Sequence, residues 1–459
     1  MKETRPFSMK DKIGYTLGDL GCCCTEQFRA MYLAIFYTLV LKVNPVHVGI
    51  LMLITKLWDA INDPLIGALV DSHQNKGKGK FIPWIKFFAF PTAVLCILGF
   101  VNVSNFAYGA RLAYMFITYV VYEIMYTCVS VPFGSLSSVM TDDVNQRTDL
   151  SRFRSLGGTI FMTVIVIAGP LFLYKDNQPV PSHFLIMAAI CAVIGFICLM
   201  FTSHWCKERI ITEPVAKEKE KLNYLDVLKA ISKNKALLGV MLSSFIGIVG
   251  AGMVNGLNTY LFRDYFGNVA IMAVSGMLSV IWSLIAFIGT KFVAKKFGKK
   301  EWIMYSATFS VVVYAILFFF PLENPMLFII INGICYLGVS GFQVLVWALV
   351  NDAIDYQELQ TGKRNEGIVY SAYTFFRKLA NAVSGSMSSF ALAIAGFQVN
   401  EAVQNEAFSG RLWKTYTGLY VVGYLLAVLV LKFIYPLTKE KTAEMLQDLA
   451  DKRNAATAE

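Results

Sequence analysis

Apolar runs of about 20 residues recur from one end of the chain to the other, and short polar stretches separate them. An α-helix needs about 20 predominantly apolar residues to cross the hydrocarbon core of a bilayer. Each run therefore predicts a membrane-spanning helix, and the whole pattern predicts an all-α polytopic membrane protein. The twelve predicted spans cover residues 13–41, 46–70, 83–103, 108–141, 153–175, 183–204, 236–262, 268–293, 302–320, 325–351, 366–396 and 412–436.

Positive charges are distributed unevenly between the loops. Lys and Arg gather in every second connection and in both terminal segments, whereas the connections between them hold few. Cytoplasmic loops of membrane proteins carry the excess of Lys and Arg, so both termini are predicted to be cytoplasmic and the number of spans to be even. The net charge of +10 follows from these loops and requires no nucleic-acid partner.

One long hydrophilic segment divides the predicted spans into two sets of six. Similar loops recur in both halves: a Gly/Lys-rich loop follows spans 2 and 8, and a mixed-charge loop follows spans 4 and 10. Two six-helix halves related in this way are typical of the major facilitator fold. The predicted organisation is an N-terminal six-helix bundle over 1–205, a cytoplasmic loop over 206–235, a C-terminal six-helix bundle over 236–438 and a cytoplasmic tail over 439–459.

Composition narrows the class of protein further. The chain is 56% hydrophobic and 16% charged, whereas soluble domains contain about 25% charged residues. Its nine cysteines lie in or beside apolar spans without paired metal-ligand spacing, so we interpret them as small buried apolar residues. The four histidines lie in loops or at span ends and form no intramembrane cluster with cysteine, which argues against a membrane-embedded enzyme. No cofactor is predicted.

Two carboxylates interrupt the apolar sequence of the second span. Asp59 and Asp63 are four residues apart and therefore lie on one face of a helix. An ionised side chain at the bilayer centre costs roughly 2.5–3.5 kcal/mol even on a lenient scale, and such groups usually face a water-filled path or a partner. The pair predicts a site for a monovalent cation, Na⁺ or H⁺. Asn62 and Thr127 are the further oxygen ligands expected for Na⁺, and no other metal is predicted.

Alternative interpretations of the intramembrane charges stay open. The two carboxylates could form an ion-pair latch with Lys56 or Lys378 that only locks helices together. Arg29 lies in mid-span and needs an anion, which is either Glu26 one turn earlier or the acid group of a bound substrate. Arg154 opens the fifth span and either lines the same path or extends its head to the interface.

Polar and aromatic side chains form stripes on several predicted spans, and such stripes indicate a wet central cavity. Tyrosine hydroxyls on the fourth span either complete a core or bind a polyol. The stripes consist of Glu26 and Arg29 on span 1, Tyr119, Tyr122, Glu123, Tyr126 and Ser130 on span 4, Arg154 on span 5, Trp347 on span 10, and Arg377 and Lys378 on span 11.

The second-span motif Lys56-Leu-Trp-Asp-Ala-Ile-Asn-Asp-Pro64 resembles that of the glycoside–pentoside–hexuronide:cation symporters, a family that includes melibiose and glucuronide carriers. The resemblance covers nearly the whole chain and implies a twelve-helix major facilitator fold with cation-coupled sugar symport by alternating access. Its further motifs are Tyr15-Thr-Leu-Gly-Asp19, Gly77-Lys-Gly-Lys-Phe81, Tyr126-Thr-Cys-Val-Ser-Val-Pro-Phe-Gly-Ser135, Val346-Trp-Ala-Leu-Val-Asn-Asp-Ala-Ile-Asp-Tyr356, Glu366-Gly-Ile-Val-Tyr370 and Thr374-Phe-Phe-Arg-Lys378.

The resemblance also implies roles for individual residues. The matching positions are Asp59 and Asp63 as cation-site carboxylates, Thr127 near that site, Lys378 close to both the carboxylates and the sugar, Arg154 lining the sugar site and Trp347 beside the sugar.

Departures from the family pattern bear on the substrate. Melibiose-type carriers have an aspartate where this chain has Ser130 and a tryptophan where it has Gly134. Their sugar-binding aspartate on span 1 aligns near Cys23, and this chain has no carboxylate there unless Glu26 takes its place. Relative to these carriers, the chain has therefore lost two carboxylates that would accept hydrogen bonds from the hydroxyls of a neutral sugar. It keeps the cationic residues Lys378 and Arg154 and adds Arg29. A hexuronide or glucuronide is the predicted substrate. A neutral pentoside or oligosaccharide is the alternative, and a lipid of the kind carried in the same superfamily is a less favoured one.

The predicted site has three parts. The cation-binding residues are Asp59, Asp63, Asn62 and Thr127, and the substrate-binding residues are Glu26, Arg29, Tyr122, Tyr126, Ser130, Arg154, Trp347 and Lys378. A cytoplasmic gate of charge pairs is predicted from Asp71, Lys78, Lys80, Asp142, Arg147, Asp352 and Asp355. The expected partners are a sugar or glycoside, a monovalent cation and the lipid bilayer of the inner (cytoplasmic) membrane, and the protein is expected to be a monomer.

Overall fold

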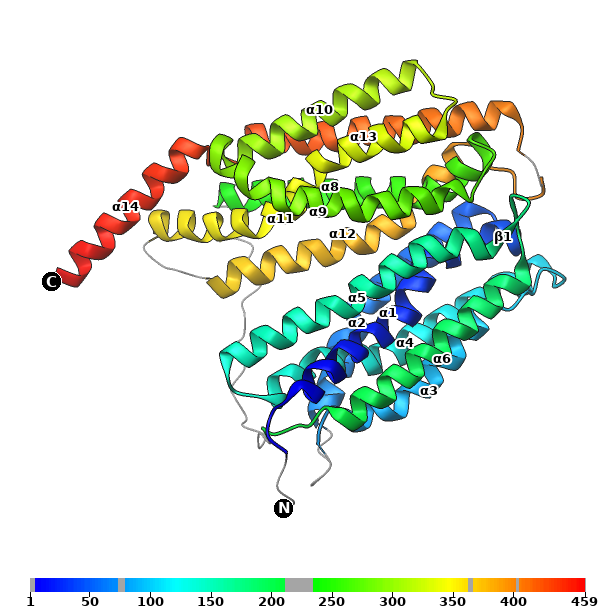
Figure 1. Cartoon of the computed structure of the whole chain (residues 1–459), viewed down its shortest axis with the longest axis horizontal. Coiled ribbons are helices and arrows are strands. Elements are labelled where there is room, and N and C mark those ends of the chain that lie inside the picture. The colour runs from blue at the N-terminus through cyan, green and yellow to red at the C-terminus, as the bar shows by residue number, and fades with distance from the viewer. Residues whose placement is uncertain (1–4, 73–78, 211–233, 362–365, 402–403, 459) are drawn as a thin grey trace. The chain divides into compact units, whose positions relative to one another are not determined.

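Long helices make up nearly all of the chain (Figure 1). The computed structural model describes residues 5–72, 79–210, 234–361, 366–401 and 404–458. The chain forms two compact units. The first comprises Met1–Ala216 with the short segments Met272–Gly276 and Gln398–Val403, and the second comprises Lys217–Ile271, Met277–Phe397 and Gln404–Glu459.

The first unit contains α1 to α6. Their bounds are α1 (Met9–Ile35), which continues into a π-helical turn η1 (Phe36–Val40), α2 (Pro45–Ser72), α3 (Ile82–Leu98), α4 (Tyr108–Met140), α5 (Val144–Leu173) and α6 (Pro181–Trp205). A short antiparallel hairpin, β1 (Tyr174–Lys175) and β2 (Gln178–Pro179), joins α5 to α6. Asp176 and Asn177 at its turn have φ angles of 50° and 61°, in the left-handed region that these residue types tolerate better than most.

The second unit contains most of α9 and all of the other helices from α8 onward. Their bounds are α8 (Lys235–Tyr260), continued by a π-helical turn η2 (Leu261–Tyr265), α9 (Ile271–Phe297), α10 (Lys299–Phe319), α11 (Pro325–Thr361), α12 (Glu366–Ile394), α13 (Glu406–Phe433) and α14 (Lys439–Ala458). Asparagine side chains cap two of them, because Asn234 accepts from the amide of Leu237 (2.9 Å) and Asn405 accepts from that of Phe408 (2.8 Å).

The helices confirm the fold class predicted from the apolar runs. Every predicted span coincides with one of the long helices α1–α6 and α8–α13. Within the described ranges, seven helices are long and apolar enough to cross a membrane by length and composition alone. α1 and α2 are not among the seven, and they carry the intramembrane charges that the candidate site uses. The sequence beyond residue 438 was expected only as a tail, whereas it forms α14, with Met445 and Leu449 buried in the core of the second unit.

Small residues let the helices of the first unit approach closely. α1 packs against both α5 and α6, α2 packs against α4, and α3 packs against α4 and α6. A Cβ atom on Gly21 would lie 2.9 Å from the carbonyl oxygen of Gly195, and one on Gly157 would collide with the carbonyl of Thr16. Such contacts hold helices together where lipid removes the hydrophobic drive for association. The packing brings the polar stripes of α1, α2 and α4 to one region.

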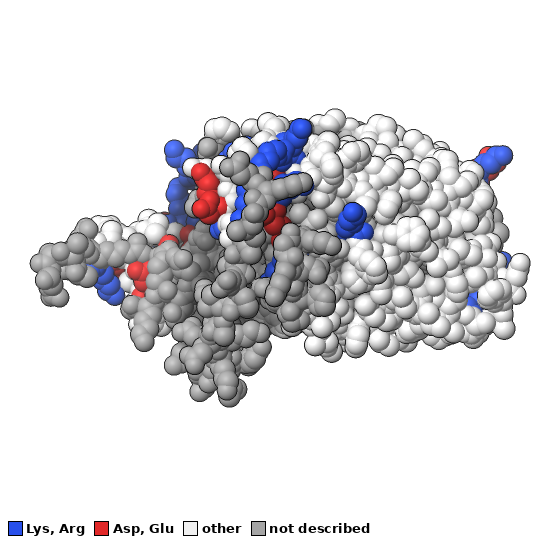
Figure 2. All heavy atoms as spheres, turned by 90° about the horizontal axis from the view of Figure 1, so that it is seen from below, with Lys and Arg blue, Asp and Glu red and all other residues white. Residues whose placement is uncertain are grey.

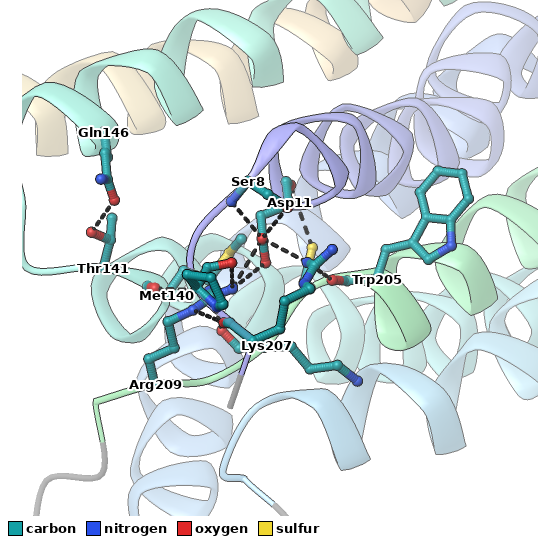
Figure 3. Close-up of polar contacts among 11 residues, drawn as sticks. Ser8, Asp11, Met140, Thr141, Gln146, Trp205, Lys207 and Arg209 are labelled. Atoms are coloured by element: carbon teal, nitrogen blue, oxygen red, sulfur yellow. Dashed lines mark hydrogen bonds and ion pairs between the residues drawn. The ribbon is translucent and has the colours of Figure 1, made fainter. Parts of the chain in front are cut away.

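A polar cluster fixes the start of α1 to other segments of the first unit (Figure 3). Asp11 is buried, accepts from the amide of Ser8 (3.0 Å) and pairs with Arg5 (2.7 Å). Its second ionic partner is Arg209 (3.0 Å), whose guanidinium also donates to the carbonyl of Met140 (3.0 Å) at the end of α4. Asp11 is therefore a buried charge whose partners come from segments far apart in the sequence.

In the second unit, α8 packs against α12 and α13, and α10 packs against α11 and α13. Gly252 and Gly256 of α8 face Ser384 and Ser388 of α12, so small residues again permit close approach.

Apolar side chains cover much of the exposed surface of both units. Phe87 in the first unit and Phe292 and Phe433 in the second are 71%, 69% and 73% exposed. On the face drawn in Figure 2, charged side chains gather toward one end, and most of the remaining described surface is uncharged. Apolar surface of this extent marks contact with lipid or with another protein rather than with water, and it agrees with the membrane-spanning helices.

Candidate functional site

Lys56 lies at the centre of three carboxylates in the first unit. Its Nζ is 3.0 Å from Asp59 Oδ2, one turn along α2, and 3.4 Å from Glu123 Oε1 on α4. Glu26 Oε1 on α1 lies 3.8 Å from the same nitrogen. The four side chains are largely shielded from solvent, with Glu123 4% exposed and Lys56 28% exposed. Three helices therefore contribute to one buried charge cluster that contains more carboxylates than ammonium groups.

Asp63 lies one turn beyond Asp59 and has a different partner. The hydroxyl of Thr127 on α4 donates a hydrogen bond to Asp63 Oδ1 (3.2 Å). Asn62 is 4% exposed, and neither its Nδ2 nor Asp59 Oδ1 has a hydrogen-bond partner among the described residues. The structure thus places Thr127 against Asp63 and the ammonium of Lys56 against Asp59, while Asn62 is buried on the same helix.

Arg29 is buried without an acidic partner of its own. It is 3% exposed, and none of its three guanidinium nitrogens has a hydrogen-bond partner in the described part of the chain. Its Cζ lies 3.5 Å from the ring centroid of Tyr122 and 5.0 Å from that of Tyr119, at distances where cation–π attraction operates. No ion pair joins Arg29 to Glu26 among the described residues, and Glu26 pairs with Lys56 instead.

Glu123 was not assigned to the site from the sequence, although it lies on the polar stripe of the fourth span. Its position in mid-span was a reason to assign it, because a carboxylate inside the membrane is costly and needs a partner. Helical spacing alone does not indicate which helix supplies that partner. The structure shows that it is Lys56 on α2.

The other predicted substrate-binding residues of the first unit lie on α4 and α5. Arg154 on α5 pairs with Asp19 on α1 (2.9 Å) and lies over the ring of Phe133 (5.2 Å). Tyr126 stacks on Tyr122 with ring centroids 5.8 Å apart. Ser130 is half-buried one turn further along α4. Arg154 thus forms an ion pair with a carboxylate, whereas Arg29 forms none with the residues that the structure describes.

The second unit contains a cavity of about 380 Å³ between α8, α10, α11, α12 and α13. Trp347 on α11 lies in its wall, stacked on Tyr370 (5.3 Å) and edge-on to Tyr373 (5.1 Å). The predicted residue Lys378 is exposed and does not line this cavity, whereas its neighbour Arg377 does. Because Lys378 and the Asp59/Asp63 pair belong to different units, their predicted proximity stays a prediction.

The predicted gate residues lie in varied surroundings. Asp352 pairs with Lys299 (2.6 Å) within the second unit, which is the kind of contact expected between the loop after span 8 and the end of span 10. Arg147 donates to the backbone carbonyl of Thr141 (2.9 Å), and Asp142 is exposed. The amide of Lys80 donates to Glu208 (2.6 Å), and Asp355 is half-buried. The side chain of Asp71 and the whole of Lys78 lie outside the described residues.

The cysteines and acidic residues offer no evident transition-metal centre. All nine cysteines are free thiols, and eight of them are buried. In the described part of the chain, no group of three or more His, Cys, Asp or Glu side chains is arranged to hold a metal ion. The chemistry that this arrangement supports is the binding of charged and polar solutes inside a membrane.

Comparisons with known proteins identify the family. The family model for MFS/sugar transport proteins matches residues 14–439. The uncharacterized symporter YjmB of Bacillus subtilis (strain 168) is 32% identical over 450 residues, which cover 97% of this chain and 96% of YjmB. The isoprimeverose transporter of Lactiplantibacillus pentosus is 28% identical (98% and 93% covered), and the glucuronide carrier protein homolog of Escherichia coli (strain K12) is 25% identical (97% and 96%).

The fold is also that of solved transporters. The crystal structure of a D-xylose–proton symporter superimposes with a TM-score of 0.62 at 15% sequence identity, covering 94% of this chain and 98% of that one. This likeness agrees with the helical organisation of both units. The chain is thus a multi-pass membrane transporter rather than an enzyme, and it belongs to the MFS/sugar transport protein family.

Proposed function

We propose that this protein is a cation-coupled symporter that moves a glycoside with an acid group, a hexuronide or glucuronide, across the cytoplasmic membrane by alternating access. Intramembrane carboxylates on α2 supply the cation site, and cationic side chains without carboxylate partners supply the preference for an anionic substrate. The glucuronide carrier protein homolog among its relatives supports this choice of substrate.

The unpaired guanidinium of Arg29 is the observation that carries the proposal for an acidic substrate. A buried charge without a partner is strongly destabilising, and the rings of Tyr119 and Tyr122 offset only part of that cost. An anion bound nearby would lower the remaining cost. Among the described residues of the first unit, no carboxylate forms an ion pair or a hydrogen bond with this guanidinium.

Coupling follows from competition for Asp59. A cation that binds at Asp59 and Asp63 weakens the contact between Asp59 and Lys56, which shifts the ammonium toward Glu26 and Glu123. The charge presented to the substrate then depends on whether the cation is bound. Linkage is reciprocal, so a cation that tightens substrate binding is itself bound more tightly by the same factor when substrate is present.

Further parts of the proposal rest on the sequence. Both termini are cytoplasmic, the protein acts as a monomer, and each predicted six-helix bundle forms one half of the transporter. The coupling cation is Na⁺ or H⁺, and charge pairs such as Lys299–Asp352 belong to a cytoplasmic gate. The proposed substrate contacts are Glu26, Arg29, Tyr122, Tyr126, Ser130, Arg154, Trp347 and Lys378.

A neutral pentoside or oligosaccharide is the second candidate substrate. The stacked rings of Tyr122 and Tyr126 would suit the apolar face of a neutral sugar, and the isoprimeverose transporter among the relatives favours this alternative.

The test is uptake by purified protein in proteoliposomes. A matched pair of substrates, 4-nitrophenyl β-D-glucuronide and 4-nitrophenyl β-D-glucoside, differs only in the acid group. Inward gradients of Na⁺ and of H⁺ are applied separately. The proposal predicts uphill uptake of the glucuronide with one of the two gradients and much weaker uptake of the glucoside. Preference for the glucoside, or uptake of the glucuronide that no gradient affects, would contradict it.

A further inference from the structure

The cavity of the second unit has the size and lining of a small-molecule site. Its volume of about 380 Å³ lies within the range of roughly 300–1,000 Å³ that ligand sites occupy. Apolar and aromatic side chains form most of the wall, and a few polar groups converge on it. The polar lining residues are Ser243, Asn255, Gln343, Arg377, Asn381 and Ser384, and the aromatic ones are Phe342, Trp347, Tyr373 and Tyr424.

Arg377 is the single charged residue among the described residues that line this cavity. Its side chain is exposed, and its Cζ lies 5.6 Å from the ring centroid of Trp347. None of the described acidic residues lies within ion-pair distance of it. Contact with the indole face holds the guanidinium by cation–π attraction and leaves its edge free to donate hydrogen bonds. Arg377 is therefore oriented by the protein without being neutralised by it.

The polar face of α12 continues from Arg377 into the cavity. Tyr373, Arg377, Asn381 and Ser384 follow one another at intervals of four, four and three residues, so they form one stripe on the helix. Lys378 is one residue further along, about 100° around the helix axis, and does not line the cavity. Of these two adjacent cationic residues, therefore, Arg377 lines the cavity and Lys378 does not.

Three amide side chains line the same cavity as the guanidinium. Gln343 on α11 lies one turn before Trp347, and Asn381 lies one turn after Arg377. Asn255 on α8 accepts a hydrogen bond from the side chain of Asn258 (3.4 Å), which leaves its own amide hydrogens to donate. Amides both donate to and accept from hydroxyl groups, as a sugar requires. A cavity lined by a planar guanidinium, an indole and several amides suits a ring that carries hydroxyls and one carboxylate.

We propose that Arg377 is the residue that contacts the acid group of the substrate, and that it makes the cavity of the second unit selective for a carboxylate-bearing sugar. The inference rests on the proposed function, because it assumes that the substrate is an anionic glycoside. Arg377 donates two parallel hydrogen bonds to the carboxylate, a geometry that a guanidinium offers and an ammonium does not. Arg29 belongs to the first unit and stays a proposed substrate contact there, whereas Arg377 is the residue of the second unit that binds the acid group.

Calorimetric titration of purified protein in detergent tests this assignment. The probes are again 4-nitrophenyl β-D-glucuronide and 4-nitrophenyl β-D-glucoside, and the variants are R377Q, R377K and, as a matched control, K414Q. Lys414 is an exposed lysine on α13 that does not line the cavity. R377Q is expected to raise the Kd for the glucuronide about 10- to 100-fold, since a hydrogen bond to a charged group contributes about 1.5–3 kcal/mol, while the Kd for the glucoside changes less than about threefold.

The variants separate recognition of the acid group from a general loss of structure. R377K keeps the charge but loses the bidentate geometry, so it should recover part of the glucuronide affinity, and K414Q should match the wild type with both probes. Equal loss of both glycosides in R377Q, or an unchanged ratio of the two Kd values, would overturn the assignment of Arg377. A wild-type protein that does not prefer the glucuronide would instead overturn the proposed function, so the two failures are distinguishable.

Discussion

Replacement of Lys56 by methionine should destabilise the protein, because it leaves three neighbouring carboxylates without their ammonium partner. The ammonium lies 3.0, 3.4 and 3.8 Å from Asp59, Glu123 and Glu26. At an effective dielectric constant of about 20, one such pair at 3.4 Å corresponds to about 5 kcal/mol of Coulomb energy before desolvation. Removal of one partner from a buried pair costs about 3–5 kcal/mol, because the remaining charge stays buried. Since Lys56 is 28% exposed, we expect the lower end of that range for K56M.

A second substitution should reverse part of this loss. The K56M variant retains three carboxylates with no ammonium between them, whereas K56M/E123Q retains two, Glu26 and Asp59. Glu123 is the least exposed of the three, at 4%, so its neutralisation relieves the largest share of the unpaired charge. We expect the double variant to be about 2 kcal/mol more stable than K56M, a coupling within the range of roughly 0.5–3 kcal/mol found for residues in one network.

Thermal unfolding in detergent, followed with a thiol-reactive dye, provides the assay. Eight of the nine cysteines are buried, so unfolding exposes them to the dye. At about 2 °C per kcal/mol, K56M should lower the Tm by about 6 °C, and E123Q in the K56M background should restore about 4 °C. K12M serves as the control, because the single described partner carboxylate of Lys12, Asp149, is 38% exposed. The charge that K12M leaves unpaired is therefore solvated, and the substitution should cost less than about 1 kcal/mol. If the Tm changes caused by K56M and E123Q alone simply add in the double variant, then Lys56 and Glu123 are not coupled, and the interpretation of these residues as one charge cluster is refuted.

Two further predictions concern the packing of the first unit. D11N removes the charge that Arg209 pairs with at a buried position, so it should lower the Tm by several degrees, since breaking a buried pair costs about 3–5 kcal/mol. D142N is the control, because Asp142 is exposed and its substitution should leave the Tm unchanged. If D11N also leaves the Tm unchanged, the stabilising role of Asp11 is contradicted. G157V should reduce the yield of folded protein on size-exclusion chromatography, because any Cβ at Gly157 collides with the carbonyl of Thr16; a wild-type elution profile would show that α1 and α5 can separate without loss.

Most of the fold could be predicted from the sequence because each membrane span is a local property. A run of about 20 apolar residues forms a helix in a bilayer whatever its neighbours are. The close contacts between helices at Gly21 and Gly157 then occur where the residues are small. α14 was not predicted, because its polar sequence gives no apolar run and its helix is stabilised by burial of Met445 and Leu449 against the second unit.

The candidate site was predictable only to the level of helix faces. Spacing placed Asp59 and Asp63 together, but it could not show that Lys56 also contacts Glu123 across two helices. Spacing likewise marked Arg377 and Lys378 as neighbours in mid-span without indicating which of them faces a cavity. The choice depends on the rotation of α12 against α8 and α11, which only the packed structure defines.

Cation-driven accumulation by the aspartate variants tests the central claim most directly. Wild-type protein, D59N and D63N are reconstituted in proteoliposomes, and uptake of 4-nitrophenyl β-D-glucuronide is followed against its gradient with an imposed Na⁺ or H⁺ gradient. Each substitution removes one carboxylate from the proposed cation site while the side chain keeps its shape, so we expect accumulation above equilibrium to be abolished and downhill exchange to persist. Accumulation that survives undiminished in both variants would contradict the assignment of Asp59 and Asp63 as the coupling site.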